Sequence, residues 1–198
     1  MDNLEAEHEY QDAKRLLDEA EQLLVERQLD QAAARFQALA KSPWPELRER
    51  AEKGLHAVQE EIQSFEDTTR EARNQSDPRA AAETWRRAHT IWPSERNIAG
   101  NLAKALVRAG EAALSAGDTA AAATDFKQVL EIKPGDKPGL AGQKKLAELE
   151  AISASIAQAR AELGQRQALD IAADDRLRAQ LAEQLRATAA YPTWQQEI

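Results

Sequence analysis

The spacing of the seven prolines constrains this chain of 198 residues more than any other feature. Proline breaks the interior of a helix but is tolerated in its first turn. Between the prolines, apolar residues recur three or four positions apart, which is the period of an amphipathic helix. The chain holds 41 Ala, the best helix former, and only 5% aromatic residues. The sequence therefore predicts an all-α fold and excludes a β-sandwich, a β-barrel and a βαβ fold.

The apolar stripes predict eight helices joined by short turns, paired into about four antiparallel hairpins within one domain over 1–198. The expected helices cover approximately 4–26, 31–41, 46–74, 78–92, 95–115, 119–132 and 137–163, with an eighth that starts between 170 and 175 and ends near Tyr191. The corresponding hairpins span about 4–42, 46–91, 95–133 and 137–191.

A shared pattern marks the second helix of the first three hairpins. A small residue is followed four positions later by an aromatic residue, three positions later by an apolar residue, and then by a proline. The three sets are Ala32, Phe36 and Leu39; Ala81, Trp85 and Ala88; and Ala122, Phe126 and Val129. We expect the small residue to allow close helix contact, the aromatic ring to fill the groove between neighbouring hairpins, and the proline to end the helix.

This pattern resembles the second half of the tetratricopeptide repeat. In the third hairpin the first helix matches too, with Leu106 and Gly110 at the large and small positions of the family. The family period is about 34 residues, whereas Phe36 and Trp85 are 49 residues apart and the extra length falls in the first helices. The resemblance implies an α-solenoid in which each hairpin contacts mainly its neighbours and the first helices line a concave surface.

The resemblance also implies a non-enzymatic scaffold that binds a peptide or protein segment on the concave surface. Some members of the family hold a carboxylate with basic residues of the first helices. Lys104 and Arg108 fall at two such positions and lie at i, i+4 on one helical face. The preceding hairpin offers Glu66 and Arg70 instead. These four residues are the candidate binding residues, although Lys and Arg are also ordinary on solvent-facing helices.

Two further roles stay open. The helices at 46–74 and 137–163 carry near-heptad apolar stripes that could pair with a second copy, which would make the chain a self-associating structural spacer. Alternatively, the chain is a regulatory or accessory segment of a larger multidomain protein.

Several kinds of chemistry are disfavoured. The chain has no Cys and only 3 His, so thiolate metal sites are excluded and multi-histidine sites have few ligands. Glu5 and His8 are spaced like the Glu-x-x-His ligands of di-iron bundles, but such bundles need two such motifs. No nucleophile has a partnered base, and no glycine-rich phosphate loop is present. We therefore expect no catalytic residue, no metal, no cofactor and no enzymatic activity.

Charge and hydropathy bear on partners. The net charge is −8, and residues 1–75 hold 18 acidic but only 10 basic residues, which argues against nucleic acid as a partner. No stretch approaches about 20 apolar residues, so no membrane span is expected. The first residues lack the basic start and apolar run of a secretory signal, which favours a cytoplasmic protein. Trp44 and Trp92 are expected to pack at helix ends, while Trp194 follows the last helix.

Overall fold

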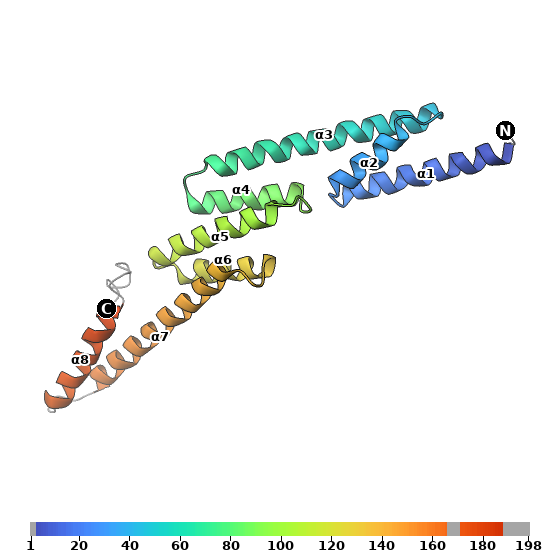
Figure 1. Cartoon of the computed structure of the whole chain (residues 1–198). Coiled ribbons are helices and arrows are strands. Elements are labelled where there is room, and N and C mark those ends of the chain that lie inside the picture. The colour runs from blue at the N-terminus through green and yellow to red at the C-terminus, as the bar shows by residue number, and fades with distance from the viewer. Residues whose placement is uncertain (1–2, 166–170, 188–198) are drawn as a thin grey trace. The chain divides into compact units, whose positions relative to one another are not determined.

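The computed structural model describes residues 3–165 and 171–187, and within these ranges the chain forms eight α-helices and no strand (Figure 1). They are α1 (Asn3–Val25), α2 (Leu29–Leu39), α3 (Pro45–Asn74), α4 (Pro78–Ile91), α5 (Ile98–Ser115), α6 (Thr119–Ile132), α7 (Lys137–Gln165) and α8 (Ile171–Ala187). The predicted all-α fold is confirmed for these residues. The first seven helices begin and end within a turn of the predicted positions, and the predicted end near Tyr191 lies outside the described residues.

The chain divides into two compact units, Met1–Leu102 and Ala103–Ile198, and the division falls within α5. In the first unit, α1 packs against α2 and α3, and α3 also packs against α2 and α4. In the second unit, α7 packs against both α6 and α8.

Local sequence explains where the helices begin. Pro45 and Pro78 occupy the first turns of α3 and α4, where the missing N–H costs nothing. The side chain of Asp77 accepts a hydrogen bond of 2.7 Å from Ala80 N, and that of Asp118 accepts one of 2.9 Å from Ala121 N. These carboxylates satisfy backbone donors that would otherwise have no partner at the starts of α4 and α6.

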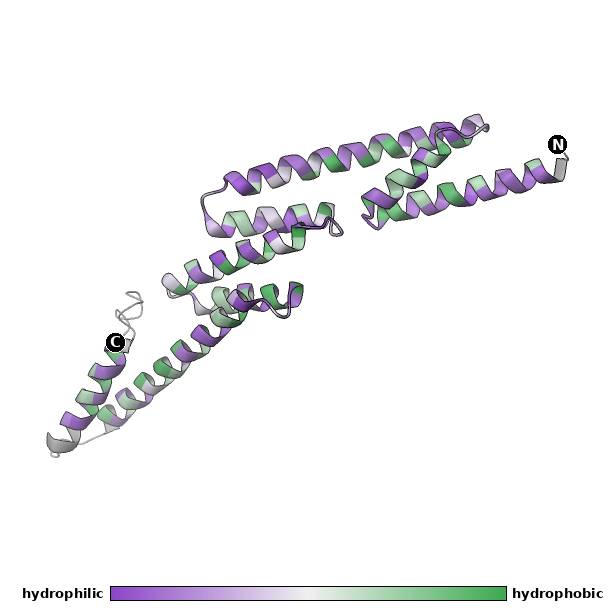
Figure 2. Ribbon diagram, in the orientation of Figure 1, coloured by the Kyte–Doolittle hydropathy of each residue, from purple (hydrophilic) through white to green (hydrophobic). Residues whose placement is uncertain are grey.

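The two halves of the long helix α3 pack against different helices. Its first half packs against α1 and α2, and its second half runs beside α4 (Figure 1). In Figure 2 hydrophobic residues recur at intervals along the mostly hydrophilic ribbon of α3, as expected for a helix that buries one face. This double use accounts for the length of α3, which lies between Phe36 and Trp85 and places them 49 residues apart.

Phe36 of α2 occupies a closely packed position in the first unit. Its side chain is fully buried, and a Cβ added to Gly54 of α3 would lie only 2.4 Å from its ring. Glycine at position 54 therefore allows the α3 backbone to contact the ring directly. Ala20 of α1, sixteen residues before Phe36, is also fully buried and belongs to the same core cluster.

Phe126 of α6 occupies the equivalent position in the second unit. The side chain is fully buried, and Cβ atoms added to Gly110 of α5 and Gly142 of α7 would lie 2.9 Å and 2.3 Å from its ring. The ring thus lies against the backbones of two helices at glycine positions. Nearby, Val129 packs against Gly139, where an added Cβ would lie 2.6 Å away.

The third aromatic position, Trp85 of α4, is 8% exposed. The small residue Ala81 of the sequence pattern is half-buried, whereas its neighbour Ala82 is buried. The buried residues of α4 include Ala82, Trp85 and Ala88, which are spaced three apart. Helices can pack along rows of residues spaced either three or four apart. The row of three moves the small position from residue 81 to residue 82.

The predicted packing of two tryptophans is confirmed. The Trp44 ring lies edge-on to Tyr10 at 5.5 Å between centroids, and the Trp92 ring lies edge-on to Phe65 at 5.3 Å. Both indoles are half-buried against the core of the first unit. Trp194 lies outside the described residues.

Candidate protein-binding surfaces

Lys104 and Arg108 are exposed on α5, whereas Ala105, Leu106 and Ala109 beside them are buried. The two basic side chains therefore project from the solvent side of a helix that is anchored by its opposite side. Within the described part of the chain, neither side chain forms an ion pair. Like charges at i, i+4 destabilise a helix by about 0.2–0.5 kcal/mol. The pair gives no stability to α5, and both cations are available to an anionic group.

Glu66 and Arg70 are both exposed on α3, in the first unit. Arg70 does not pair with Glu66, because its Nη1 lies 2.8 Å from Oδ1 of Asp67 instead. The Glu66 carbonyl accepts a hydrogen bond of 3.0 Å from the Thr69 hydroxyl. The structure thus places the four candidate residues as two separate pairs, one on α3 in the first unit and one on α5 in the second.

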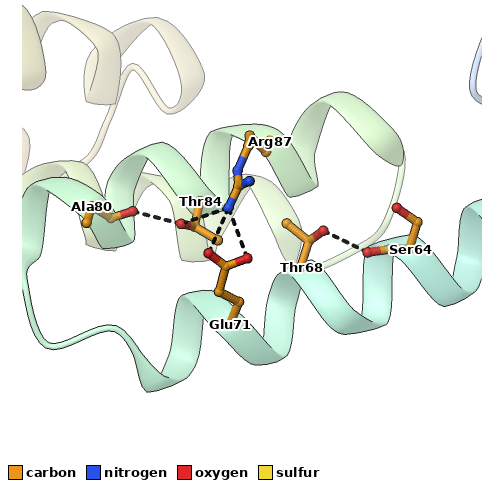
Figure 3. A network of polar contacts seen from close by, with 6 residues as sticks. All are labelled: Ser64, Thr68, Glu71, Ala80, Thr84 and Arg87. Atoms are coloured by element: carbon orange, nitrogen blue, oxygen red, sulfur yellow. Dashed lines mark hydrogen bonds and ion pairs between the residues drawn. The ribbon is translucent and has the colours of Figure 1, made fainter.

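A polar network joins α3 to α4 close to Arg70 in the sequence (Figure 3). Nη2 of Arg87 lies 2.9 Å and 3.0 Å from the two carboxylate oxygens of Glu71, and it also donates to the Thr84 hydroxyl at 3.4 Å. That hydroxyl donates to the Ala80 carbonyl at 2.9 Å. Because the ion pair is more than half exposed, it contributes at most about 1 kcal/mol. The same residues border an open hollow of about 570 Å³.

One carboxyl group on α3 is electrostatically perturbed. The Lys53 ammonium lies 2.6 Å from the Glu49 carboxylate, one turn away, and this hydrogen bond and charge lower the pKa of Glu49. Glu49 is exposed on the helix surface. The pair is an ordinary i, i+4 ion pair and provides no chemistry for a reaction.

The apolar stripes of both long helices are covered for the most part inside their own units. The buried positions are Leu47, Ala51, Val58, Phe65, Thr69 and Ala72 in α3, and Leu146, Leu149, Ile156 and Ala159 in α7. The remaining stripe residues Leu55, Ile62, Ile152 and Leu163 are half-buried. Self-association was inferred because such stripes could need cover from a second copy. Where the chain buries these residues itself, the stripes need no second copy to cover them. Self-association therefore stays a prediction.

Glu5 and His8 are both exposed on α1, and no group of three or more His, Cys, Asp or Glu side chains comes together there or elsewhere in residues 3–165 and 171–187. Of the described helices, none combines the length and the apolar character needed to cross a membrane.

Sequence reasoning missed two glycines. Each lies on the helix that follows an aromatic ring and contacts that ring. Gly54 and Gly142 both lie in helix interiors, where glycine costs about 1 kcal/mol relative to alanine. A glycine inside a helical pattern is visible in the sequence as an unfavourable helix residue, but the ring that it contacts is shown only by the structure.

Comparison with protein-family models, with curated proteins and with solved structures finds no match for this chain.

Proposed function

We propose that this chain is a non-enzymatic scaffold that binds a peptide or protein segment through a tetratricopeptide-like stack of helical hairpins. In this proposal the four hairpins follow one another as a solenoid, and α1, α3, α5 and α7 line its concave surface. Lys104 and Arg108 contact an acidic side chain or a terminal carboxylate of the partner.

The close packing around two aromatic rings supports the repeat architecture. Phe36 and Phe126 each follow a small residue by four positions, are fully buried, and lie against a glycine on the next long helix. A ring that contacts both its own hairpin and the following helix is what a consecutive stack of hairpins requires.

The observation that carries the binding role is the pair Lys104 and Arg108. The two side chains are exposed one turn apart and have no ion pair within the described residues. Arginine and lysine recognise carboxylates through charge-assisted hydrogen bonds. The proposal assigns no catalysis, because the candidate residues lie on exposed helix faces.

The binding role is tested with the double variant Lys104→Glu/Arg108→Glu. Proteins captured and cross-linked by the whole chain in cells that express it are identified by mass spectrometry, and the leading partner is then titrated. We expect the double variant to bind that partner about 10- to 100-fold more weakly, because attraction becomes repulsion. Lys127→Glu/Arg176→Glu is the matched control, since both residues are exposed in the same unit but lie on α6 and α8, outside the helices that line the proposed surface. Equal affinity of wild type and Lys104→Glu/Arg108→Glu would reject this binding face.

The architecture is tested separately by small-angle X-ray scattering. A compact globule of this length would have a radius of gyration of about 16 Å. A consecutive stack predicts a clearly larger value and an elongated distance distribution. A value close to that of the globule would contradict the stack, whatever the binding experiment shows.

A further inference from the structure

A groove of about 470 Å³ opens in the first unit, between α1 and the connection from α2 to α3. Its apolar lining includes Leu16, Leu39 and Trp44. Four charged residues also line it, the acidic Asp12 and Glu19 and the basic Arg15 and Lys41. This volume and this mixture of apolar surface with a few polar groups are typical of ligand-binding pockets.

Trp44 and its loop form a firmly held wall of the groove. The indole is half-buried and lies edge-on to Tyr10, with an angle of 71° between the ring planes. The backbone N–H of Trp44 donates to the hydroxyl of the buried Ser42 at 3.3 Å, and Arg48 donates to the Ser42 carbonyl at 3.4 Å. A wall that is already ordered loses little conformational entropy when a ligand binds.

Negative charge gathers along α1 beside this groove. Glu5 and Glu9 lie on the same helical face as Asp12, N-terminal to the groove lining. Both are exposed, and within the described residues neither forms an ion pair. Asp12 pairs with Arg15 at 3.2 Å, and both side chains are at least 70% exposed. An exposed pair of this kind is worth little and can be exchanged for a partner's cation at small cost.

We propose that the groove binds a segment of a partner protein that carries Lys or Arg next to a large apolar side chain. The apolar side chain lies on Leu16 and Trp44, where aromatic and aliphatic side chains of a partner become fully desolvated. The basic side chains reach Glu9 and Asp12, whose charge is complementary. The site is independent of Lys104 and Arg108, which lie in the second unit and attract the opposite charge.

The probe is a library of random peptides displayed on phage and selected on the full chain. We expect enrichment of peptides that combine Lys or Arg with Leu, Phe or Trp. These peptides should bind Ala38→Arg at least about 10-fold more weakly than wild type, because Ala38 lines the groove and an arginine fills it. Gln37→Arg is the matched control, since it adds the same side chain on the same helix outside the groove lining and should bind as wild type does. Circular dichroism and thermal melts establish that both variants fold.

A second arm tests the charge contribution. Glu9→Lys/Asp12→Lys should weaken binding of the enriched peptides several-fold and reduce the dependence of affinity on salt, since exposed charges interact less at high ionic strength. The variant Lys104→Glu/Arg108→Glu should leave this binding unchanged, which separates the groove from the proposed function.

Several results would overturn the groove proposal. They are failure to enrich any peptide, enrichment of acidic peptides, and equal affinity for wild type and Ala38→Arg. A dimer in sedimentation experiments that Ala38→Arg dissociates would show that a second copy occupies the groove, and this would overturn it as well.

Discussion

Phe36 in the first unit and Phe126 in the second are both buried between helices, but different residues surround the two rings. Each ring is fully buried and lies against a glycine of the following long helix. A Cβ added to Gly54 would lie 2.4 Å from the nearest atom of the Phe36 ring, and one added to Gly142 would lie 2.3 Å from the nearest atom of the Phe126 ring. The residue on the preceding helix, α1 for Phe36 and α5 for Phe126, differs between the two units. Sixteen residues before the ring stands Gly110 in the second unit but Ala20 in the first.

This difference shows how the two units hold their helices together. The second unit places two glycines against one ring and accepts their helix-forming cost of about 1 kcal/mol each. The first unit uses one glycine and adds ion pairs between helices, such as Arg50–Glu21 at 2.8 Å and Arg87–Glu71 at 2.9 Å. Surface charge therefore contributes to helix pairing in the first unit.

The largest expected effect tests whether the two rings are equivalent. Phe36→Ala and Phe126→Ala should each lower the free energy of unfolding by about 3–5 kcal/mol, because each leaves a cavity in a buried position. Urea denaturation followed by circular dichroism measures this loss. A large loss for one variant and less than about 1 kcal/mol for the other would break the equivalence.

Trp85→Ala extends the comparison to the third aromatic position. The indole is 8% exposed, and the residue sixteen positions earlier is the buried Thr69 in place of a smaller Ala or Gly. We expect a loss of about 3 kcal/mol, at the lower end for large core truncations. The same denaturation experiment measures it. A loss below about 1 kcal/mol would mean that Trp85 does not belong to the set.

Glycine substitutions test the close contacts between the helix backbones and the two rings. Gly142→Ala and Gly54→Ala should each destabilise the chain by about 1 kcal/mol, because overpacking against a buried ring exceeds the gain in helix propensity. Gly110→Ala should be nearly neutral, since its added Cβ lies 2.9 Å from the ring and needs a smaller shift. Thermal denaturation ranks the three variants.

Gly100→Ala is the control for these substitutions, because an added Cβ there meets no atom within 4 Å. It should stabilise the chain by up to about 1 kcal/mol through helix propensity alone. If Gly142→Ala raised stability as much as Gly100→Ala does, close contact with Phe126 would be disproved.

A smaller effect is expected from salt on helix pairing in the first unit. Exposed ion pairs contribute at most about 1 kcal/mol each and are screened at high ionic strength. Hydrogen exchange with mass spectrometry should show less protection of α1 and α3 near 1 M salt than at low salt, because Arg50 and Glu21 join these two helices. Arg50→Met should reduce this salt-dependent loss, and an equal loss in wild type and variant would contradict the assigned role of the ion pair.

The smallest expected effect concerns Glu49 in the first unit. Lys53→Met should raise the pKa of Glu49 towards its ordinary value, because the hydrogen bond and charge that lower it are removed. A carboxyl with a lowered pKa adds stability above its unfolded-state pKa and loses it as the pH falls through the folded-state pKa. Nuclear magnetic resonance titration of the side-chain carboxyl measures the shift, and an unchanged pKa would reject the assigned cause.

Much of the fold could be predicted because its signals are local. Prolines and capping aspartates mark the helix starts, and apolar spacing marks the buried faces, as for Phe36 and Phe126. The burial of Ala82 in place of Ala81 could not be predicted in this way, because the row of residues along which two helices pack depends on both helices. The exposure of Lys104 and Arg108 followed from their place on a helical face.

The candidate sites were less predictable, because they join distant parts of the sequence. The groove combines residues of α1 with the loop after α2, and the α3–α4 network pairs Glu71 with Arg87. No local pattern relates such positions.

Local preferences were thus sufficient for the helices, their ends and their buried faces, since hydrogen bonds and apolar periodicity act within a few residues. Which backbone contacts which ring, and where a groove stays open, depended on how whole helices pack. Those distances result from side-chain volumes on several helices at once, and Gly54 and Gly142 acquire their role only there.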